Sequence, residues 1–153
     1  MGTTEVLERF YGAFARRDHQ AMAACYTPDA EFSDPVFPHL AGPEVPGMWR
    51  MLCERGTDLR LEYRDLHADE ATGSAHWEAW YTFSATRRPV HNVIEARFEF
   101  ADGRIRRHRD TFDLYRWARQ ALGLKGLLLG WTPPVQAAVR AQARRALTRF
   151  LQT

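Results

Sequence analysis

The segment Asp102-Gly-Arg-Ile-Arg-Arg-His-Arg-Asp-Thr-Phe-Asp113 is the most informative stretch of this chain. Its first two residues are a turn signal, and the alternation that follows them is typical of a β-strand. Side chains two positions apart in a strand share one face. We therefore expect five side chains of this strand on the same face of a sheet: Arg106, His108, Asp110, Phe112 and Leu114.

An earlier segment, Glu31-Phe-Ser-Asp-Pro-Val-Phe37, places Asp34 among aromatic side chains at the end of another strand. A carboxylate between apolar walls, with an imidazole on a facing strand, is what a small acid–base site requires. We predict that Asp34, His108 and Asp110 converge in one cavity, where burial would raise the pKa of Asp34. Two structural alternatives stay open. In the first, Asp34 caps a turn at the proline and has no other role. In the second, His108 and Asp110 form a structural hydrogen-bonded pair without a catalytic role.

The rest of the chain predicts an α+β domain. A first helix capped by Thr4 is expected, then a second one capped by Asp18, and a third over residues 44–55 after a Pro-rich bend. The apolar stripe of the first helix consists of Leu7, Phe10, Tyr11 and Phe14. Strands are expected near residues 58–67, 73–85, 90–101 and 104–116. Helices followed by consecutive strands favour helices packed on one face of a curved antiparallel meander.

Two of these strands have one face that is less charged than the other, and we expect this face to point inward. The inward residues are Trp77, Ala79 and Tyr81 on one strand and Asn92, Ile94, Ala96 and Phe98 on the next. Trp80 then belongs to the outer, convex face. Each aromatic residue here could be plain core instead of a ligand contact.

Residues 117–153 form a C-terminal extension. It is expected to contain a helical stretch to about Leu122, an apolar Gly-rich hinge and an amphipathic helix after Pro133-Pro134. Residues 114–153 carry seven basic side chains and no acid, whereas residues 1–113 carry 14 basic and 19 acidic ones. We favour a lid over the domain or a contact with a partner subunit, because the leucines of the hinge and Trp131 need burial. Contact with an anionic membrane surface is a weaker interpretation, and nucleic-acid binding is the weakest.

The composition excludes several classes of protein. A chain of 153 residues with 45% hydrophobic and 26% charged residues fits one globular domain. Neither a signal peptide nor a membrane-spanning run is visible, so a cytoplasmic location is expected. The six histidines and two cysteines show no metal-ligand spacing, and no phosphate loop or nucleophile elbow is present. We therefore expect no metal and no cofactor. The single lysine among 21 basic residues suggests a GC-rich bacterial genome.

The order of these elements resembles a known family. Three helices, an E-F-x-D-P strand with a Pro-rich loop, and a meander ending in D-G-R-I-x-x-H-R-D-x-F-D are similar to the SnoaL-like, ketosteroid-isomerase-like branch of the nuclear-transport-factor-2-like superfamily. The resemblance covers residues 4–116, so we divide the chain into a domain of residues 1–116 and an extension of residues 117–153. It implies a cone-shaped curved sheet wrapped on helices, with a deep pocket and a homodimer formed through the convex face.

The resemblance also implies roles for individual residues. Asp34 falls at the position of the general base of the steroid isomerases, and Tyr11 lies on the helix that carries their hydroxyl donor. His108 and Asp110 look like the acid–base pair of the polyketide cyclases. The last-strand aspartate of limonene-type epoxide hydrolases also falls on Asp110. The Arg-x-Asp strand of those enzymes, however, would fall on Ala79 and Tyr81, which disfavours epoxide hydrolysis.

These inferences lead to one functional hypothesis and one alternative. The hypothesis is a cofactor-free isomerase, cyclase or dehydratase for a small hydrophobic carbonyl compound, with Asp34, His108 and Asp110 as catalytic residues. The side chains expected to contact the substrate are Tyr11, Phe14, Phe32, Trp49, Trp77, Tyr81, Asn92 and Phe112. Tyr11 or Tyr81 would donate a hydrogen bond to the developing enolate. The alternative is a non-catalytic ligand-binding or dimeric assembly domain of the same fold.

Overall fold

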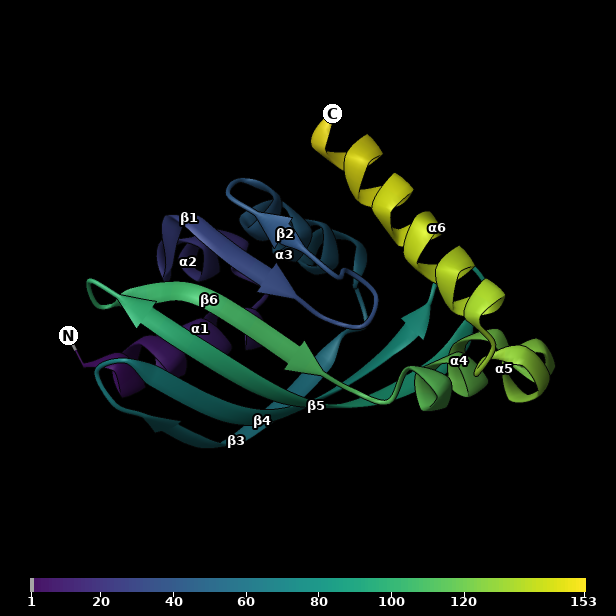
Figure 1. Ribbon diagram of the computed structural model, residues 1–153, viewed down its shortest axis with the longest axis horizontal. Helices are drawn as coiled ribbons and strands as arrows, with labels where there is room; N and C mark the ends of the chain where they lie inside the picture. The colour runs from purple at the N-terminus through teal and green to yellow at the C-terminus, as the bar shows by residue number, and fades with distance from the viewer. Residues whose placement is uncertain (1) are drawn as a thin grey trace.

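The computed structural model describes residues 2–153 and contains six helices and six strands in that range (Figure 1). The helices are α1 (Thr3–Ala15), α2 (His19–Ala24), α3 (Glu44–Arg55), α4 (Leu114–Leu122), α5 (Leu124–Leu129) and α6 (Pro133–Leu151). The strands are β1 (Tyr26–Ser33), β2 (Leu40–Ala41), β3 (Arg60–Ala68), β4 (Thr72–Phe83), β5 (Arg88–Ala101) and β6 (Arg104–Thr111). The predicted third helix has the expected bounds.

The strands form one curved sheet in the order β2-β1-β6-β5-β4-β3. Together with the helices it gives the α+β cone fold that was expected, so the fold class is confirmed. Four of the five strand pairings are antiparallel, and the pairing of β1 with β6 is parallel. This parallel pairing brings the two segments with the acid–base residues side by side, since Phe32 lies opposite His108.

Aspartate side chains mark the start of two helices, α2 and α4. The side chain of Asp18 accepts a hydrogen bond from the backbone N–H of Ala21, so the predicted cap of the second helix is confirmed. The predicted cap of the first helix at Thr4 is wrong, because the helix begins at Thr3 with Gly2 as its N-cap and Thr4 lies within it. The last strand ends at Thr111 instead of continuing to residue 116. It ends there because the side chain of Asp113 caps α4 by accepting from the N–H of Arg116.

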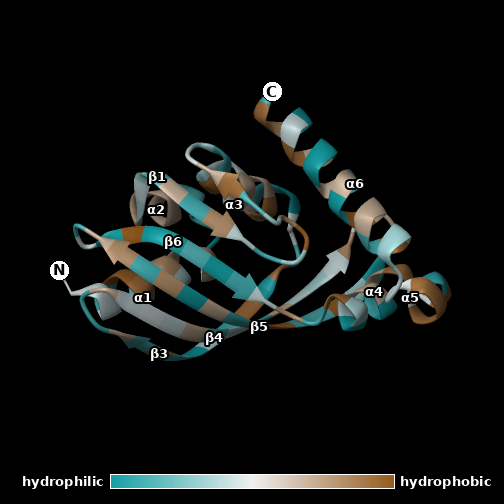
Figure 2. Ribbon diagram, in the orientation of Figure 1, coloured by the Kyte–Doolittle hydropathy of each residue, from teal (hydrophilic) through white to brown (hydrophobic). Residues whose placement is uncertain are grey.

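The core lies between the inner face of the sheet and helices α1 to α3. Hydrophobic and hydrophilic residues alternate along β5 (Figure 2), as expected for a strand with one buried face. β6 is hydrophilic apart from Ile105, and its buried face holds His108 and Asp110. The inward set predicted from the sequence is buried or half-buried: Trp77, Ala79, Tyr81, Asn92, Ile94, Ala96 and Phe98. Trp80 is on the outer face, where its ring stacks on His91 at 4.5 Å between centroids.

The predicted placement of Arg106 on the face of His108 is wrong. The β5–β6 pairing shifts its register between Glu99 and Phe100. The alternation of inward and outward side chains in β6 is therefore offset by one residue before Arg107. Ile105 is therefore the buried residue, and Arg106 points outward to Glu31, with an Nη1–Oε2 distance of 3.1 Å.

The C-terminal extension packs on the same chain. Leu147 and Phe150 of α6 are buried in the main core, next to α3. The leucines of the hinge and Trp131 are not buried by the packing of this chain on itself, because they lie on the exposed helix α5 and just after it. Their burial against a partner subunit stays a prediction. None of the helices over residues 2–153 has both the length and the apolar character needed to cross a bilayer.

Candidate functional site

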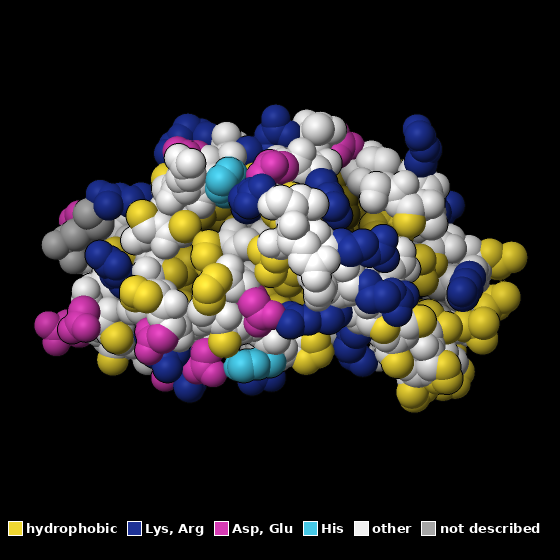
Figure 3. All heavy atoms as spheres, turned by 90° about the horizontal axis from the view of Figure 1, so that it is seen from above, with side chains coloured by type: hydrophobic (Ala, Val, Ile, Leu, Met, Phe, Trp, Pro, Cys, Tyr) yellow, Lys and Arg dark blue, Asp and Glu magenta, His cyan; other side chains and the backbone are white. Residues whose placement is uncertain are grey.

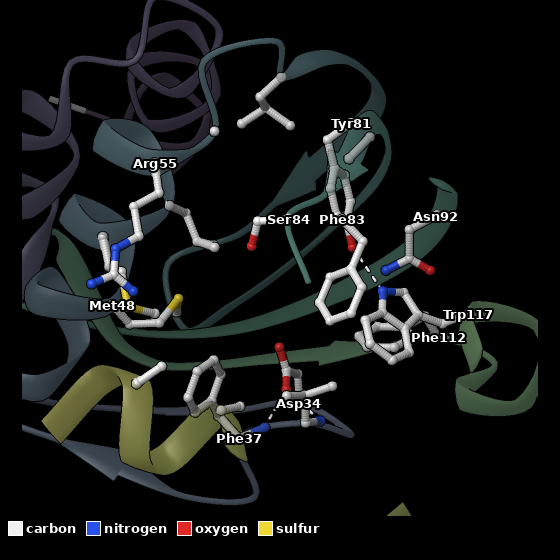
Figure 4. Close-up of a pocket in the computed structure, with 18 of the residues that line it drawn as sticks. Asp34, Phe37, Met48, Arg55, Tyr81, Phe83, Ser84, Asn92, Phe112 and Trp117 are labelled. Carbon is white, nitrogen blue, oxygen red and sulfur yellow. Dashed lines mark hydrogen bonds between the residues drawn. The ribbon is translucent and has the colours of Figure 1, made fainter. Parts of the chain in front are cut away.

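A cavity of about 360 Å³ opens between the sheet and the helices α3, α4 and α6 (Figure 4). Its wall is mainly apolar and includes aromatic side chains from every side: Phe37, Trp49, Trp77, Tyr81, Phe83, Phe112 and Trp117. The polar groups in the wall include Asp34, Asp110 and Asn92. A concave apolar site of this size with a few polar groups is the usual form of a small-molecule pocket.

Asp34 lies at one side of the cavity, in the turn after β1. Its Oδ1 accepts from the backbone N–H groups of Val36 at 2.7 Å and Phe37 at 2.6 Å, and its own N–H donates to the carbonyl of Phe37. The side chain therefore caps a turn and still lines the cavity, into which its carboxyl group points (Figure 4). The turn holds one oxygen in place and leaves the other for a ligand.

The surroundings of Asp34 favour its neutral form. Burial, with a smaller contribution from the charge of Asp110, raises its pKa from the ordinary 3.8 to about 7 against the opposing effect of the hydrogen bonds from Phe37 and Val36. A carboxyl group with a pKa near 7 exchanges a proton readily at neutral pH. This is the property that a general acid–base residue needs.

Asp110 ends a chain of buried hydrogen bonds. Its Oδ1 accepts from Nε2 of His108 at 2.8 Å, and Nδ1 of the same ring lies 2.7 Å from the hydroxyl of Tyr26. The hydroxyl of Tyr26 in turn accepts from Nε1 of Trp49 at 2.9 Å. A weaker contact at 3.5 Å joins Nε1 of Trp77 to Asp110. Asp110 lines the cavity, but His108 is fully buried behind it.

The donors and acceptors of this chain fit together in one arrangement. Trp49 can only donate, so the hydroxyl proton of Tyr26 is free to go to Nδ1 of His108. The imidazole is then neutral and carries its proton on Nε2, from which it donates to the carboxylate of Asp110. A doubly protonated ring would leave the hydroxyl proton of Tyr26 without an acceptor in the chain. The arrangement therefore fixes the ring tautomer and orients Asp110 toward the cavity.

Two neutral polar side chains face the carboxyl groups. The hydroxyl of Tyr81 accepts from Nε1 of Trp117 at 2.7 Å, which leaves its own proton for a ligand. Burial raises the pKa of Tyr81 to about 12, so it remains a donor at neutral pH. Asn92 lies beside this pair in the cavity wall (Figure 4).

The structure divides the expected site residues into two groups. Seven line the cavity: Asp34, Asp110, Trp49, Trp77, Tyr81, Asn92 and Phe112. Four others, Tyr11, Phe14, Phe32 and His108, are buried behind the wall. The hydroxyl of Tyr11 has no hydrogen-bond partner within residues 2–153, and burial raises its pKa well above the ordinary value.

Several residues at the site did not figure among the expected ones. Tyr26, which holds His108, has no motif around it, and only the pairing of β1 with β6 brings the two together. Trp117 and Val139 come from the extension and close one side of the cavity. The amphipathic pattern of the extension is the one sequence signal that pointed to such a role. Arg55 of α3 also lines the cavity.

Within residues 2–153, no three side chains of His, Cys, Asp or Glu come together in an arrangement that could hold a metal ion. Asp110 is bonded to His108 and Trp77 and forms no ion pair with an arginine of the extension in this part of the chain.

Solved structures of several proteins share this fold. An LEH-like epoxide hydrolase from M. tuberculosis is 22% identical, with a TM-score of 0.63 over 84% of this chain and 96% of that chain. IdmH from Streptomyces antibioticus, a proposed polyketide cyclase, is 19% identical, with a TM-score of 0.66 over 81% and 100%. A hypothetical protein with a ketosteroid isomerase-like fold from Catenulispora acidiphila, solved with trimethylamine, is 14% identical, with a TM-score of 0.68 over 84% and 98%.

At these identities the likeness concerns the fold. A comparison with curated proteins gives no match. The profile of the SnoaL-like domain matches residues 7–108, which span α1 to β6 and include both Asp34 and His108. The chain therefore belongs to the SnoaL-like domain family.

Proposed function

We propose that this protein is a cofactor-independent acid–base enzyme that acts on a small hydrophobic carbonyl compound, as an isomerase, cyclase or dehydratase does. One observation carries the proposal: two carboxyl groups, Asp34 and Asp110, line the same apolar cavity. Paired titratable groups in different surroundings are the usual basis of acid–base chemistry at neutral pH. Asp34 is held by backbone N–H groups alone, whereas Asp110 is held by the ring of His108.

Asp34 is the proposed general base. Its ionised form would remove a proton from the carbon next to the substrate carbonyl, and the electron pair of that C–H bond would move toward the carbonyl oxygen. Tyr81 is placed in the wall as a donor for this oxygen, because its own proton is free while Trp117 donates to it. The proton then returns from Asp34 to the same or another carbon of the substrate, so that base and substrate both regain their starting charge.

Asp110 is the proposed second acid–base group. The hydrogen bond from Nε2 of His108 orients its carboxyl group in the cavity wall. A second acid–base group is useful where another substrate atom, out of reach of Asp34, must gain or lose a proton. Ring closure and loss of water are reactions of this kind. Deprotonation and reprotonation could then occur at different faces of the substrate.

The wall suggests the kind of substrate. The cavity of about 360 Å³ is at the small end of ligand pockets, and aromatic rings make up much of its lining. A compound with one or two rings and a single carbonyl would place its apolar body against these rings. The proposed polyketide cyclase and the ketosteroid isomerase-like protein among the structural neighbours support this class without specifying a compound.

Hydrogen–deuterium exchange tests the proposal even though the natural substrate is unidentified. A panel of small cyclic ketones is incubated with the protein in D₂O, and loss of the α-hydrogen signal is followed by NMR. We expect exchange above the buffer rate for at least one ketone. Asp34→Asn should slow it about a hundredfold or more, because a general base contributes this much. Asp110→Asn should also slow it.

Asp102→Asn is the matched control. Asp102 lies in the exposed turn before β6 with a φ of 53°, a conformation that asparagine also adopts readily. Exchange that survives in Asp34→Asn at the wild-type rate would contradict the role of Asp34. Ketones that bind in the cavity but never exchange would instead identify a non-catalytic ligand-binding domain.

A further inference from the structure

The most unusual surface of the molecule is the short helix α5 and the residue pair that follows it. Five large apolar side chains are strongly exposed there: Leu124 (70%), Leu127 (49%), Leu128 (60%), Leu129 (47%) and Trp131 (65%). We call this group the apolar tip. It lies at one end of the long axis of the molecule, opposite the N-terminus (Figure 1), and α5 is among the most hydrophobic helices of the chain (Figure 2). Monomeric soluble proteins rarely expose so many large apolar side chains together.

The packing of α5 explains why its leucines face outward. Gly126 and Gly130 are the buried residues of this segment, and both face α4. A Cβ on Gly126 would overlap the carbonyl oxygen of Ala118, and one on Gly130 would lie 2.8 Å from the Cβ of Ala118. The hydroxyl of Tyr115 also donates to the carbonyl of Leu127 at 2.8 Å. The close glycine contact thus fixes the helix with its small residues inside and its large ones in solvent.

The surroundings of the apolar tip are basic. Lys125 is exposed within α5, Arg119 is exposed on α4, and the guanidinium of Arg88 lies beside Gly123 at the junction of the two helices. None of these three side chains forms an ion pair with a carboxylate of residues 2–153. No acid occurs in residues 114–153. On the face shown in Figure 3, this end of the molecule displays hydrophobic and basic side chains without acidic ones.

We propose that the apolar tip docks the protein on an anionic lipid surface. Leucine and tryptophan side chains on a protruding element can enter the boundary between headgroups and acyl chains. The basic side chains around them, which form no ion pair with a carboxylate of residues 2–153, complement the negative charge of such a surface. α5 has only six residues, so the contact is peripheral.

A second copy of this chain fits the apolar tip less well. A twofold interface places the same patch of both subunits against each other. The basic side chains around one tip would then face those of the other, with no acid nearby in the sequence after Asp113. The charge around the patch therefore favours an anionic partner over self-association.

The amphipathic helix α6 is not the proposed contact. Its apolar side is occupied, since Leu147 and Phe150 are buried in the core, and Val139 and Ala143 line the cavity. The docking surface is thus separate from the carboxyl groups, and the inference does not depend on the proposed function. Because Leu122 and Trp117 line the cavity close to α5 in the chain, docking would bring the cavity near the lipid surface.

Cosedimentation with vesicles tests the proposal on the full chain. One set of vesicles is phosphatidylcholine alone, and the other is an equimolar mixture of phosphatidylglycerol and phosphatidylcholine. We expect binding to the mixed vesicles at low salt, little binding to phosphatidylcholine, and loss of binding as salt screens the charges. Trp131 is the most exposed of the five tryptophans, so brominated lipids should quench mainly its fluorescence.

Two variants and two controls separate the apolar and the electrostatic contributions to vesicle binding. Replacing both Leu127 and Leu128 by Ser should weaken binding to mixed vesicles about tenfold or more, because two large apolar side chains no longer leave water. Lys125→Glu should weaken it and reduce its salt dependence. Leu151→Ser makes the apolar change at another exposed leucine, and Arg104→Glu makes the charge change at the β5–β6 turn. Both controls should bind like the wild type, and circular dichroism should show that all variants fold.

Three results would overturn the proposal. The first is absence of binding to mixed vesicles at low salt. The second is salt-sensitive binding that the double leucine variant retains, which would indicate a purely electrostatic contact elsewhere. The third is a dimer of the wild type that the double leucine variant converts to a monomer without any binding to vesicles, which would assign the apolar tip to a second copy of the chain.

Discussion

At the scale of single residues, the hydrogen bonds around His108 set the arrangement of the site. Tyr26 accepts from Trp49 and lies within hydrogen-bond distance of His108, so its hydroxyl joins two buried rings. The hydroxyl of Tyr11 is equally buried but has no partner in residues 2–153. Replacing either tyrosine by phenylalanine removes one buried hydroxyl. In Tyr26 this hydroxyl has hydrogen-bond partners, and in Tyr11 it has none within residues 2–153.

Tyr26→Phe should lower the free energy of unfolding by about 1–3 kcal/mol, because it leaves buried polar groups on both neighbouring rings unpaired. Tyr11→Phe removes a hydroxyl that has no partner, and we expect it to leave the stability unchanged or to raise it. Urea unfolding of both variants measures this. Equal losses of stability in the two variants would contradict the hydrogen-bond chain.

The raised pKa of Asp34 makes stability depend on pH. In the unfolded chain this carboxyl ionises near 3.8, and in the folded protein burial holds its pKa at about 7. The folded state thus binds more protons between these values, so Asp34 makes the free energy of unfolding fall as pH rises through this window. Its stabilising contribution is complete below the unfolded value and lost above the folded one.

Asp34→Asn should remove this slope, since asparagine keeps an oxygen for the N–H groups of Val36 and Phe37 but does not titrate. The stability of the variant relative to the wild type should rise between pH 4.5 and 7, by a few kcal/mol at most. Thermal unfolding across this range measures the difference, with Asp102→Asn as the control. A difference independent of pH would show that Asp34 titrates normally.

At the scale of elements, the contact between α4 and α5 depends on glycine. A side chain at position 126 would meet the backbone of Ala118, which cannot rotate away as a flexible side chain can. Gly126→Ala should therefore destabilise the protein by about 1–3 kcal/mol, even though alanine is the better helix former. Lys125→Ala, at the exposed neighbouring position, should change the stability little.

Thermal unfolding and limited proteolysis measure the effect of Gly126→Ala. If the close packing holds α5 in place, the variant should be cleaved faster between α4 and α6 than the wild type or Lys125→Ala. Wild-type stability and cleavage in Gly126→Ala would show that α5 is not tightly packed on α4.

At the scale of the whole molecule, the extension is part of the domain that contains the cavity. α6 runs across the open end of the sheet, with its last turns beside α3 (Figure 1). Leu147 is fully buried in the main core, while Leu151, one turn later, is 41% exposed. α6 therefore depends on a few side chains to hold it over the cavity.

Leu147→Ala should cost about 2–5 kcal/mol of unfolding free energy, the usual range for a leucine removed from a packed core. Leu151→Ala should cost clearly less. Hydrogen exchange should show faster exchange along α6 in Leu147→Ala, because the helix loses its main anchor. Unchanged protection of α6 would mean that the contacts near the cavity are enough to hold it.

The local features of this fold follow from short stretches of sequence. Period-two alternation identified the buried faces of β4 and β5, helical spacing identified α3, and Asp18 marked the start of α2. Asp34 and Asp110 could also be chosen from the sequence, because a carboxylate among aromatic residues on a strand is visible within a few positions. These signals are local, so they do not depend on how distant segments pair.

The tertiary structure alone decided what distant segments do together. The register of β1 against β6 brings Tyr26 to His108, and the shift between β5 and β6 turns Arg106 outward. Which face of α5 meets α4 depends on the space beside Ala118, so a run of leucines that reads as core is exposed. In each case the outcome depends on strand register or close packing between segments, and neither is encoded within one segment.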